Sequence, residues 1–189
     1  MIHTKSFIVE LWSKIFSGLL WVSPFRILGI FIPAIKIRAD AVEGYVLANL
    51  FLSIGLLVIC SAPNLQWWEV FAICWAIFRV FEVVIYQIDV LLFSEYRTKK
   101  AGKPYAVRSF RRIVVLLLHN YVEIIFWFAL IYPNIDWAFD SGGINLNSFL
   151  ASFNFSFVTM TTFGYSSAFP KHDLGYILTL IQSAIGLFM

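Results

Sequence analysis

The chain has 189 residues, of which 60% are hydrophobic and only 13% are charged, and its formal net charge is +3. Soluble domains carry about 25% charged residues, and a chain of this length cannot bury so much apolar surface in one core. The composition therefore excludes an ordinary soluble domain and indicates an integral membrane protein whose apolar side chains are solvated by lipid. The small net charge gives no indication of nucleic-acid binding, and no exposed domain for it is predicted.

Four apolar segments are candidates for membrane-spanning helices, since about 20 mostly apolar residues are needed to cross the hydrocarbon. Three of them are long enough, at about 45–62, 67–93 and 113–132. The fourth, 174–189, is apolar but short, because at 1.5 Å per residue it extends over only about 24 Å. We expect an all-α membrane protein with four transmembrane helices.

The positions of the basic residues predict the orientation of these helices. Lys and Arg gather in the first 41 residues and in the loop 94–112, whereas the connections at 63–66 and 133–147 contain none. Cytoplasmic loops collect Lys and Arg, so both termini and the basic loop are expected in the cytoplasm. From the small size of the chain we expect a plasma (inner) membrane. The loop could also contact anionic lipid, although topology alone explains its charge.

The chain before the first predicted span is harder to interpret. Residues 15–35 are apolar enough for a fifth span, but Pro24, Arg26 and Pro33 interrupt them. We expect residues 1–41 to be an amphipathic segment on the cytoplasmic face, with a spanning or re-entrant segment as the alternative. A peripheral two-helix unit at 42–93 and the basic loop 94–112 follow.

The region 147–170 predicts a pore loop. Residues 148–161 can form a helix, but one too short to cross about 30 Å of hydrocarbon, and the chain from Thr162 to Ser166 is then irregular. Irregular backbone at membrane depth is tolerated only where it is buried in protein or lines water. A half-helix entering from the outer face would direct the negative end of its dipole toward the pore centre and favour a cation there.

The residues of this region resemble the filter signature of potassium channels. Positions 156–165 read Ser-Phe-Val-Thr-Met-Thr-Thr-Phe-Gly-Tyr, and the family pattern is Thr-Thr-Val-Gly-Tyr-Gly-Asp. The resemblance covers about 113–189 and implies a pore module with outer helix 113–132, pore helix 148–161, filter 162–166 and inner helix 174–189. The implied ion-binding filter residues are Thr162, Phe163, Gly164, Tyr165 and Ser166.

The resemblance also implies how such a module works. Rings of backbone carbonyls from four subunits replace the hydration shell of potassium, so a homotetramer is expected, with potassium ions in the filter and no other cofactor or metal. Gly164 would let carbonyls point inward. Gly175 and Gly186 have the spacing of two inner-helix glycines, and Gly186 is the implied gating hinge.

Three departures from the family pattern leave the permeant ion open. Phe163 replaces Val or Ile, Ser166 replaces the second glycine, and Ser167 replaces the aspartate that anchors the filter. The alternatives to a potassium channel are a non-selective cation channel and a non-conducting membrane subunit or scaffold. The sequence stops soon after Gly186, so either it is part of a longer chain or an intracellular gate is absent.

Away from their ends, the predicted spans contain three acidic or basic residues. Arg79 and Glu82 share a face of the second span, and Glu123 lies on the third. Charges at membrane depth are expensive and often functional, so we weigh a coupling network against an internal ion pair that docks the two helices. The sequence shows no catalytic constellation, and we do not expect an enzyme.

Overall fold

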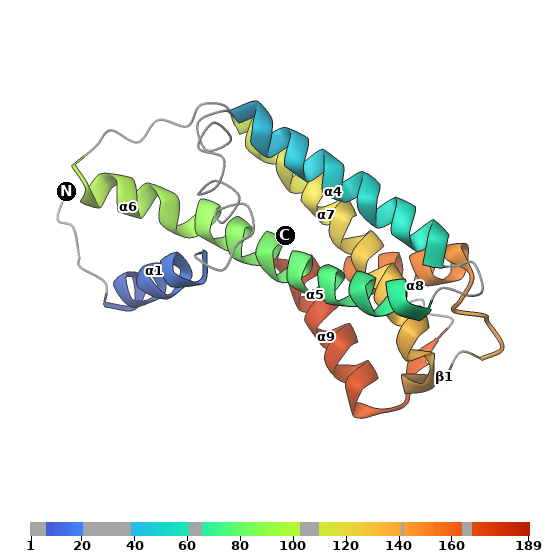
Figure 1. The fold of residues 1–189 in the computed structure, drawn as a ribbon. Coiled ribbons are helices and arrows are strands. Elements are labelled where there is room, and N and C mark those ends of the chain that lie inside the picture. Colours follow the sequence, from blue (N-terminus) through green and yellow to red (C-terminus); the bar gives the residue numbers. More distant parts are fainter. Residues whose placement is uncertain (1–6, 21–38, 61–65, 103–109, 141, 164–167) are drawn as a thin grey trace. The chain divides into compact units, whose positions relative to one another are not determined.

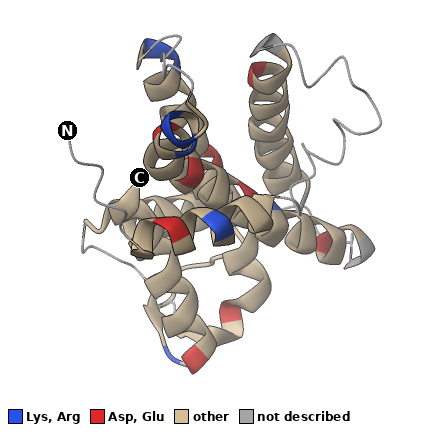
Figure 2. Ribbon diagram, turned by 90° about the vertical axis from the view of Figure 1, so that its left-hand side faces the viewer, with Lys and Arg blue, Asp and Glu red and all other residues tan. Residues whose placement is uncertain are grey.

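The structure is a computed structural model that describes residues 7–20, 39–60, 66–102, 110–140, 142–163 and 168–189. These residues are mostly helical, as predicted (Figure 1). Charged residues are sparse along the helices (Figure 2). The elements in chain order are α1 (Phe7–Leu19), α4 (Ala39–Cys60), α5 (Gln66–Ile88), η2 (Asp89–Phe93), α6 (Ser94–Lys100), α7 (Phe110–Ile131), η3 (Tyr132–Ala138), β1 (Phe139–Asp140), α8 (Phe149–Thr161), β2 (Phe169–Pro170) and α9 (Asp173–Phe188).

Two of the described helical stretches are both long and apolar enough to cross a membrane. They are Ala41–Ile59 in α4 and Phe110–Ala138, which joins α7 to η3. Helix α5 has 23 residues, about 35 Å, but it carries charged side chains along its length. Helix α9 has 16 residues, about 24 Å, and is shorter than the hydrocarbon core.

The first part of the predicted basic loop is helical. The backbone stays in the α region at Ile88, passes through the π-helical turn η2, and continues into α6 as far as Lys100. Ion pairs explain this extension, since Arg97 donates to both carboxylate oxygens of Asp89 and Lys99 pairs with Glu95 one turn away at 2.5 Å. Loop 94–112 is therefore in part a continuation of the second predicted span.

The chain forms two compact units, and the first comprises residues 1–44 and 81–114. Within it, the rings of Phe16 and Phe93 stack with their centroids 5.4 Å apart, which packs α1 against η2. The Lys100 ammonium donates to Glu10 at 2.7 Å. This hydrogen bond lowers the pKa of Glu10 and raises the pKa of Lys100 from their ordinary values.

The second unit comprises residues 45–80 and 115–189. Helices α8 and α9 pack closely in it. A small antiparallel sheet pairs Phe139 with Pro170 and Asp140 with Phe169. The all-α prediction did not contain this sheet, which links the chain after η3 to the chain before α9 and pairs backbone groups that would otherwise need other partners. The largest fully buried side chains of the second unit include Trp127, Tyr132, Leu57, Ile124, Leu130 and Met160.

Gly175 lets α9 begin directly against this sheet. A Cβ atom there would lie 2.7 Å from the carbonyl oxygen of Ala138 and 3.2 Å from the Cβ of Pro170. Gly175→Ala should therefore lower the free energy of unfolding by about 1–3 kcal/mol through overpacking. Gly55→Ala in α4 is the matched control, because nothing lies within 4 Å of its added methyl group. Thermal unfolding of both variants in detergent measures the difference, and equal midpoints would contradict this packing.

Candidate functional site

Helix α8 has the length expected of a pore half-helix. It occupies Phe149–Thr161, inside the predicted range 148–161, and its 13 residues extend over about 20 Å. That is less than the roughly 30 Å of a hydrocarbon core. No basic residue lies in its last turn, so no cation of the helix itself neutralises the negative end of the dipole.

The C-terminal end of α8 is closed by a pair of backbone hydrogen bonds. The N–H of Phe163 donates to the Val158 carbonyl at 3.2 Å, and the N–H of Thr162 donates to the Thr159 carbonyl at 3.3 Å. This is a Schellman motif, with Thr162 in the left-handed region at φ 53°. A β-branched residue rarely adopts this conformation, which costs of order 1–3 kcal/mol.

The structure shows two of the five predicted filter residues. Thr162 and Phe163 follow directly on α8, and the Phe163 side chain is 80% exposed in the single chain. Gly164, Tyr165 and Ser166 lie outside the described residues. The filter assignment therefore stays a prediction, with its first two residues placed at the carbonyl end of the half-helix.

A buried cluster of polar side chains joins α8 to its neighbouring helices. The Tyr132 hydroxyl donates to Gln182 Oε1 at 2.5 Å. Gln182 Nε2 donates to the carbonyl oxygen of Ser156 at 3.0 Å and to its Oγ at 2.8 Å. Ser156 Oγ donates to the carbonyl of Ile125 at 2.7 Å. Tyr132, Ser156 and Gln182 are fully buried, so the cluster joins η3, α8, α9 and α7 away from solvent.

Sequence reasoning missed this cluster. The signal for it was a polar residue in the apolar segment 174–189, since a polar side chain inside a membrane helix faces the protein interior and finds a partner there. Gln182 is that residue, but its partner Tyr132 lies 50 positions away in the chain. Only the folded arrangement identifies such a partner.

Gly186 lies where α9 packs directly against the backbone of α8 at Met160. A Cβ atom added there would overlap the backbone carbonyl of Met160. The nearby Ser183 Oγ donates to the Thr159 carbonyl at 3.2 Å. The structure therefore gives Gly186 a packing role at the end of the half-helix, and the hinge implied by resemblance stays a prediction.

Aromatic rings pack around the same half-helix. Tyr132 and Phe155 meet edge to face with centroids 4.6 Å apart, and Phe139 contacts both rings at 5.4 and 5.2 Å. Edge-to-face pairs of this kind contribute about 0.5–1.5 kcal/mol beyond their buried area. They fix the ring of Tyr132, and with it the direction of the hydroxyl that reaches Gln182.

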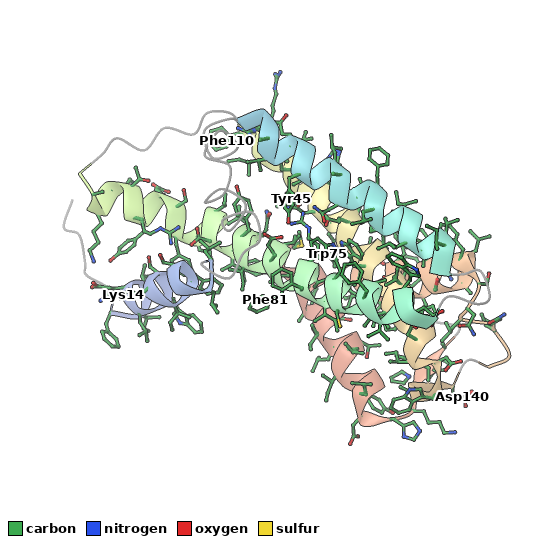
Figure 3. The ribbon with its side chains drawn as sticks, in the orientation of Figure 1. Lys14, Tyr45, Trp75, Phe81, Phe110 and Asp140 are labelled. Carbon is green, nitrogen blue, oxygen red and sulfur yellow. The ribbon has the colours of Figure 1, made fainter. Side chains whose placement is uncertain are left out.

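Two of the three predicted intramembrane charges form a buried ion pair. Arg79 of α5 donates to both carboxylate oxygens of Glu123 of α7, at 2.6 and 3.1 Å. Trp127 Nε1 donates to the same carboxylate at 3.0 Å. The Arg79 guanidinium also lies 4.6 Å from the ring centroid of Tyr45. Tyr45 belongs to α4 and is labelled in Figure 3. Glu82, the third predicted residue, is buried as well.

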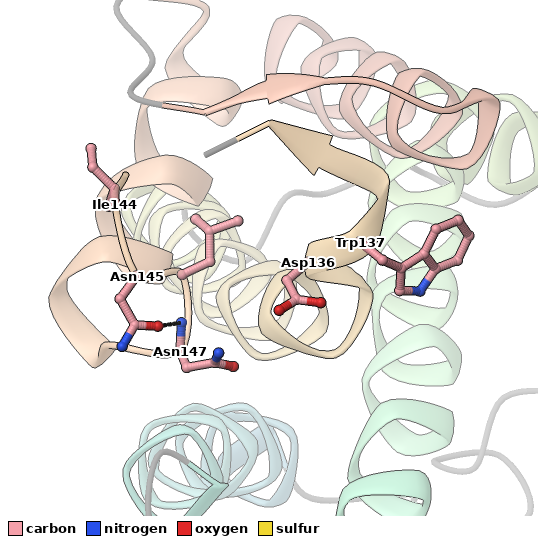
Figure 4. A pocket seen from close by; sticks show the side chains of 6 residues that line it. Asp136, Trp137, Ile144, Asn145 and Asn147 are labelled. Atoms are coloured by element: carbon pink, nitrogen blue, oxygen red, sulfur yellow. Dashed lines mark hydrogen bonds between the residues drawn. The ribbon is translucent and has the colours of Figure 1, made fainter. Parts of the chain in front are cut away.

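A pocket lies in the connection between α7 and α8. Asp136, Trp137, Ile144, Asn145, Leu146 and Asn147 line it (Figure 4). Asn145 Oδ1 accepts a hydrogen bond from the backbone N–H of Asn147 at 3.0 Å, which shapes one wall. No group of three or more His, Cys, Asp or Glu side chains that could hold a metal ion occurs among the described residues.

Comparison with known proteins identifies the part of the chain that contains this arrangement. Residues 114–189 match the family model described as "Ion channel". These residues are therefore similar to an ion channel domain. The match contains α8, α9 and most of α7, and the segment 1–113 lies outside it. Comparisons with curated proteins and with solved structures gave no match.

The ion channel match confirms the predicted pore-loop channel family. Together with the long apolar helices it indicates an integral membrane protein that transports ions rather than an enzyme. The half-helix, its carbonyl end and the polar cluster behind it all lie within the matched residues.

The buried ion pair gives a stability prediction. Glu123→Met leaves the Arg79 charge buried without its carboxylate, which should lower the free energy of unfolding by about 3–5 kcal/mol. The double variant Arg79→Met/Glu123→Met should recover part of that loss, because neither member of this pair then stays buried without the other. Denaturation in mixed micelles measures the free energy of unfolding of the wild type, the single variant and the double variant.

An exposed ion pair provides the control for this comparison. Lys99 and Glu95 are each about half exposed, so Glu95→Ala should change stability by less than about 1 kcal/mol. A Glu123→Met protein as stable as the Glu95→Ala protein would contradict the structural role of the buried pair.

Proposed function

We propose that the chain conducts monovalent cations, potassium in particular, passively through a homotetrameric pore. The observation that carries the proposal is the half-helix α8, whose carbonyl end runs into the potassium-type filter signature at Thr162 and Phe163. The family match covers this same region. The negative end of the half-helix dipole favours a cation at that position, and the filter backbone would supply carbonyl oxygens to it.

The tetramer follows from the geometry that such a filter needs. One chain supplies one filter segment, whereas a ring of carbonyls requires four. Exposed apolar side chains on the pore region support association with other copies or with lipid, since a soluble monomer would leave them in water. These side chains include Leu150, Phe157, Phe163, Leu180 and Leu187.

The proposed membrane arrangement has four spans with both termini in the cytoplasm of a plasma membrane. Helix α1 would lie on the cytoplasmic face, because its exposed apolar side chains form a face suited to the headgroup region. They are Phe7, Ile8, Leu11, Trp12 and Ile15. In α6, Arg97, Lys99 and Lys100 each pair with an acidic side chain, so they would offer less free charge to anionic lipid than the sequence alone indicates.

A non-selective cation channel is the second candidate. The departures at Phe163, Ser166 and Ser167 favour it, because they change the residues expected to brace the filter. The exposed ring of Phe163, one of these departures, and the left-handed backbone of Thr162 support this candidate, because both residues directly follow α8.

Reversal potentials test the proposal. The purified protein is reconstituted in planar bilayers with potassium on one side and sodium on the other. We expect a reversal close to the potassium equilibrium potential, and Gly164→Ala should abolish or strongly reduce this selectivity, because a side chain there would oppose the filter backbone. Gly55→Ala is the control, since its added methyl group meets no other atoms.

The other outcomes separate the alternatives. A reversal near zero with a sizeable current would contradict potassium selectivity and favour the non-selective channel. An absence of current from verified tetramers would contradict conduction by this chain and favour a non-conducting membrane subunit.

A further inference from the structure

We propose that Gln182 is a positioning residue of the pore, which holds the half-helix α8 against α9 and thereby sets ion discrimination at the filter. The inference rests on the proposed conduction function. It assigns a role to a residue outside the filter and starts from the hydrogen bonds that Gln182 makes in the interior of the second unit.

Both polar atoms of the Gln182 side chain have hydrogen-bond partners. Its two amide protons have acceptors in the carbonyl oxygen and the Oγ of Ser156, and its Oε1 accepts from the Tyr132 hydroxyl. A backbone carbonyl can only accept, so the NH₂ group has to face Ser156 and Oε1 has to face Tyr132. The bonds form a directed chain from Tyr132 through Gln182 and Ser156 to the carbonyl of Ile125, and such chains strengthen one another in a low dielectric.

Apolar contact alone would not define this geometry. Helices in a membrane pack through small residues and van der Waals contact, which allows neighbouring registers with similar energies. A buried amide has a partner in one register and is left unsatisfied in the others, at the cost of an orphaned polar group. Gln182 therefore selects one rotation and one height of α9 relative to α8.

The contact continues from Gln182 to the end of the half-helix. Ser183 Oγ donates to the Thr159 carbonyl, and Gly186 lies against the Met160 carbonyl. Thr162, the first predicted filter residue, directly follows Thr161, the last residue of α8. A change in the position of α9 at Gln182 would therefore shift the carbonyl end of α8 and the start of the filter together.

The test compares three variants with a matched control in the full-length reconstituted protein. Gln182→Met keeps a linear side chain but removes every hydrogen bond, while Tyr132→Phe and Ser156→Ala each remove one partner. Tyr176→Phe is the control, because it removes a hydroxyl from the exposed face of the same helix α9. The readouts are the sodium-to-potassium permeability ratio and amide hydrogen exchange along the chain.

We expect Gln182→Met to change the permeability ratio by about fivefold or more, the factor that corresponds to the loss of one net hydrogen bond. Tyr132→Phe should shift the ratio in the same direction, and the two effects should not add, since both substitutions break one chain of bonds. Exchange should accelerate in the C-terminal half of α8 and the filter, and not in α4. The Tyr176→Phe protein should match the wild type in both readouts.

An unchanged permeability ratio in Gln182→Met would overturn the inference, and so would faster exchange spread evenly over all helices, which indicates a general loss of stability. If the wild-type protein carries no current, the proposed function fails, and hydrogen exchange still decides on Gln182. Local acceleration in α8 would then support its positioning of the half-helix, and an unchanged α8 would contradict it.

Discussion

Polar groups in the hydrocarbon region have to find their partners inside the protein, and this constraint determines how the second unit is built. Two buried polar clusters satisfy it. One pairs Arg79 with Glu123 and so joins α5 to α7. The other links Tyr132, Gln182 and Ser156, and so joins η3, α9 and α8. Each cluster connects helices that are distant in sequence. Sliding one of these helices along its neighbour would break the hydrogen bonds of a buried charge or a buried amide.

This arrangement relates stability to the proposed conduction. In the proposed channel, the filter backbone would present its carbonyl oxygens at a defined distance from the ion, and its position would depend on the end of the half-helix. Ser183 and Gly186 of α9 contact that end at Thr159 and Met160, while Arg79 and Glu123 join helix α5 to helix α7. The ion pair fits the docking interpretation of the intramembrane charges, since Arg79 of α5 and Glu123 of α7 are opposite charges in direct contact.

The sequence predicted the elements whose signal is local. The apolar run before Pro133 predicted the helix α7, and a short apolar stretch before Thr162 predicted the half-helix α8. It missed the helical continuation to Lys100, because that depends on an ion pair of Arg97 with Asp89 across a π-helical turn. It placed Arg79 and Glu82 on one face of the second span and Glu123 on the third, but the hydrogen bonds from Arg79 to Glu123 are seen only in the fold. Polar partners that are far apart in the chain can be identified only in the folded structure.

The central claim, a cation pore formed by four copies around the end of α8, is tested most directly by electron cryo-microscopy in lipid nanodiscs containing potassium. The account predicts four-fold symmetry, with the segments from Thr162 to Ser166 converging on the axis and ion density between their carbonyl oxygens. It also predicts Gln182 between Tyr132 and Ser156 in each subunit. A monomer or dimer, or a tetramer whose filter segments lie away from the axis without ion density, would contradict it.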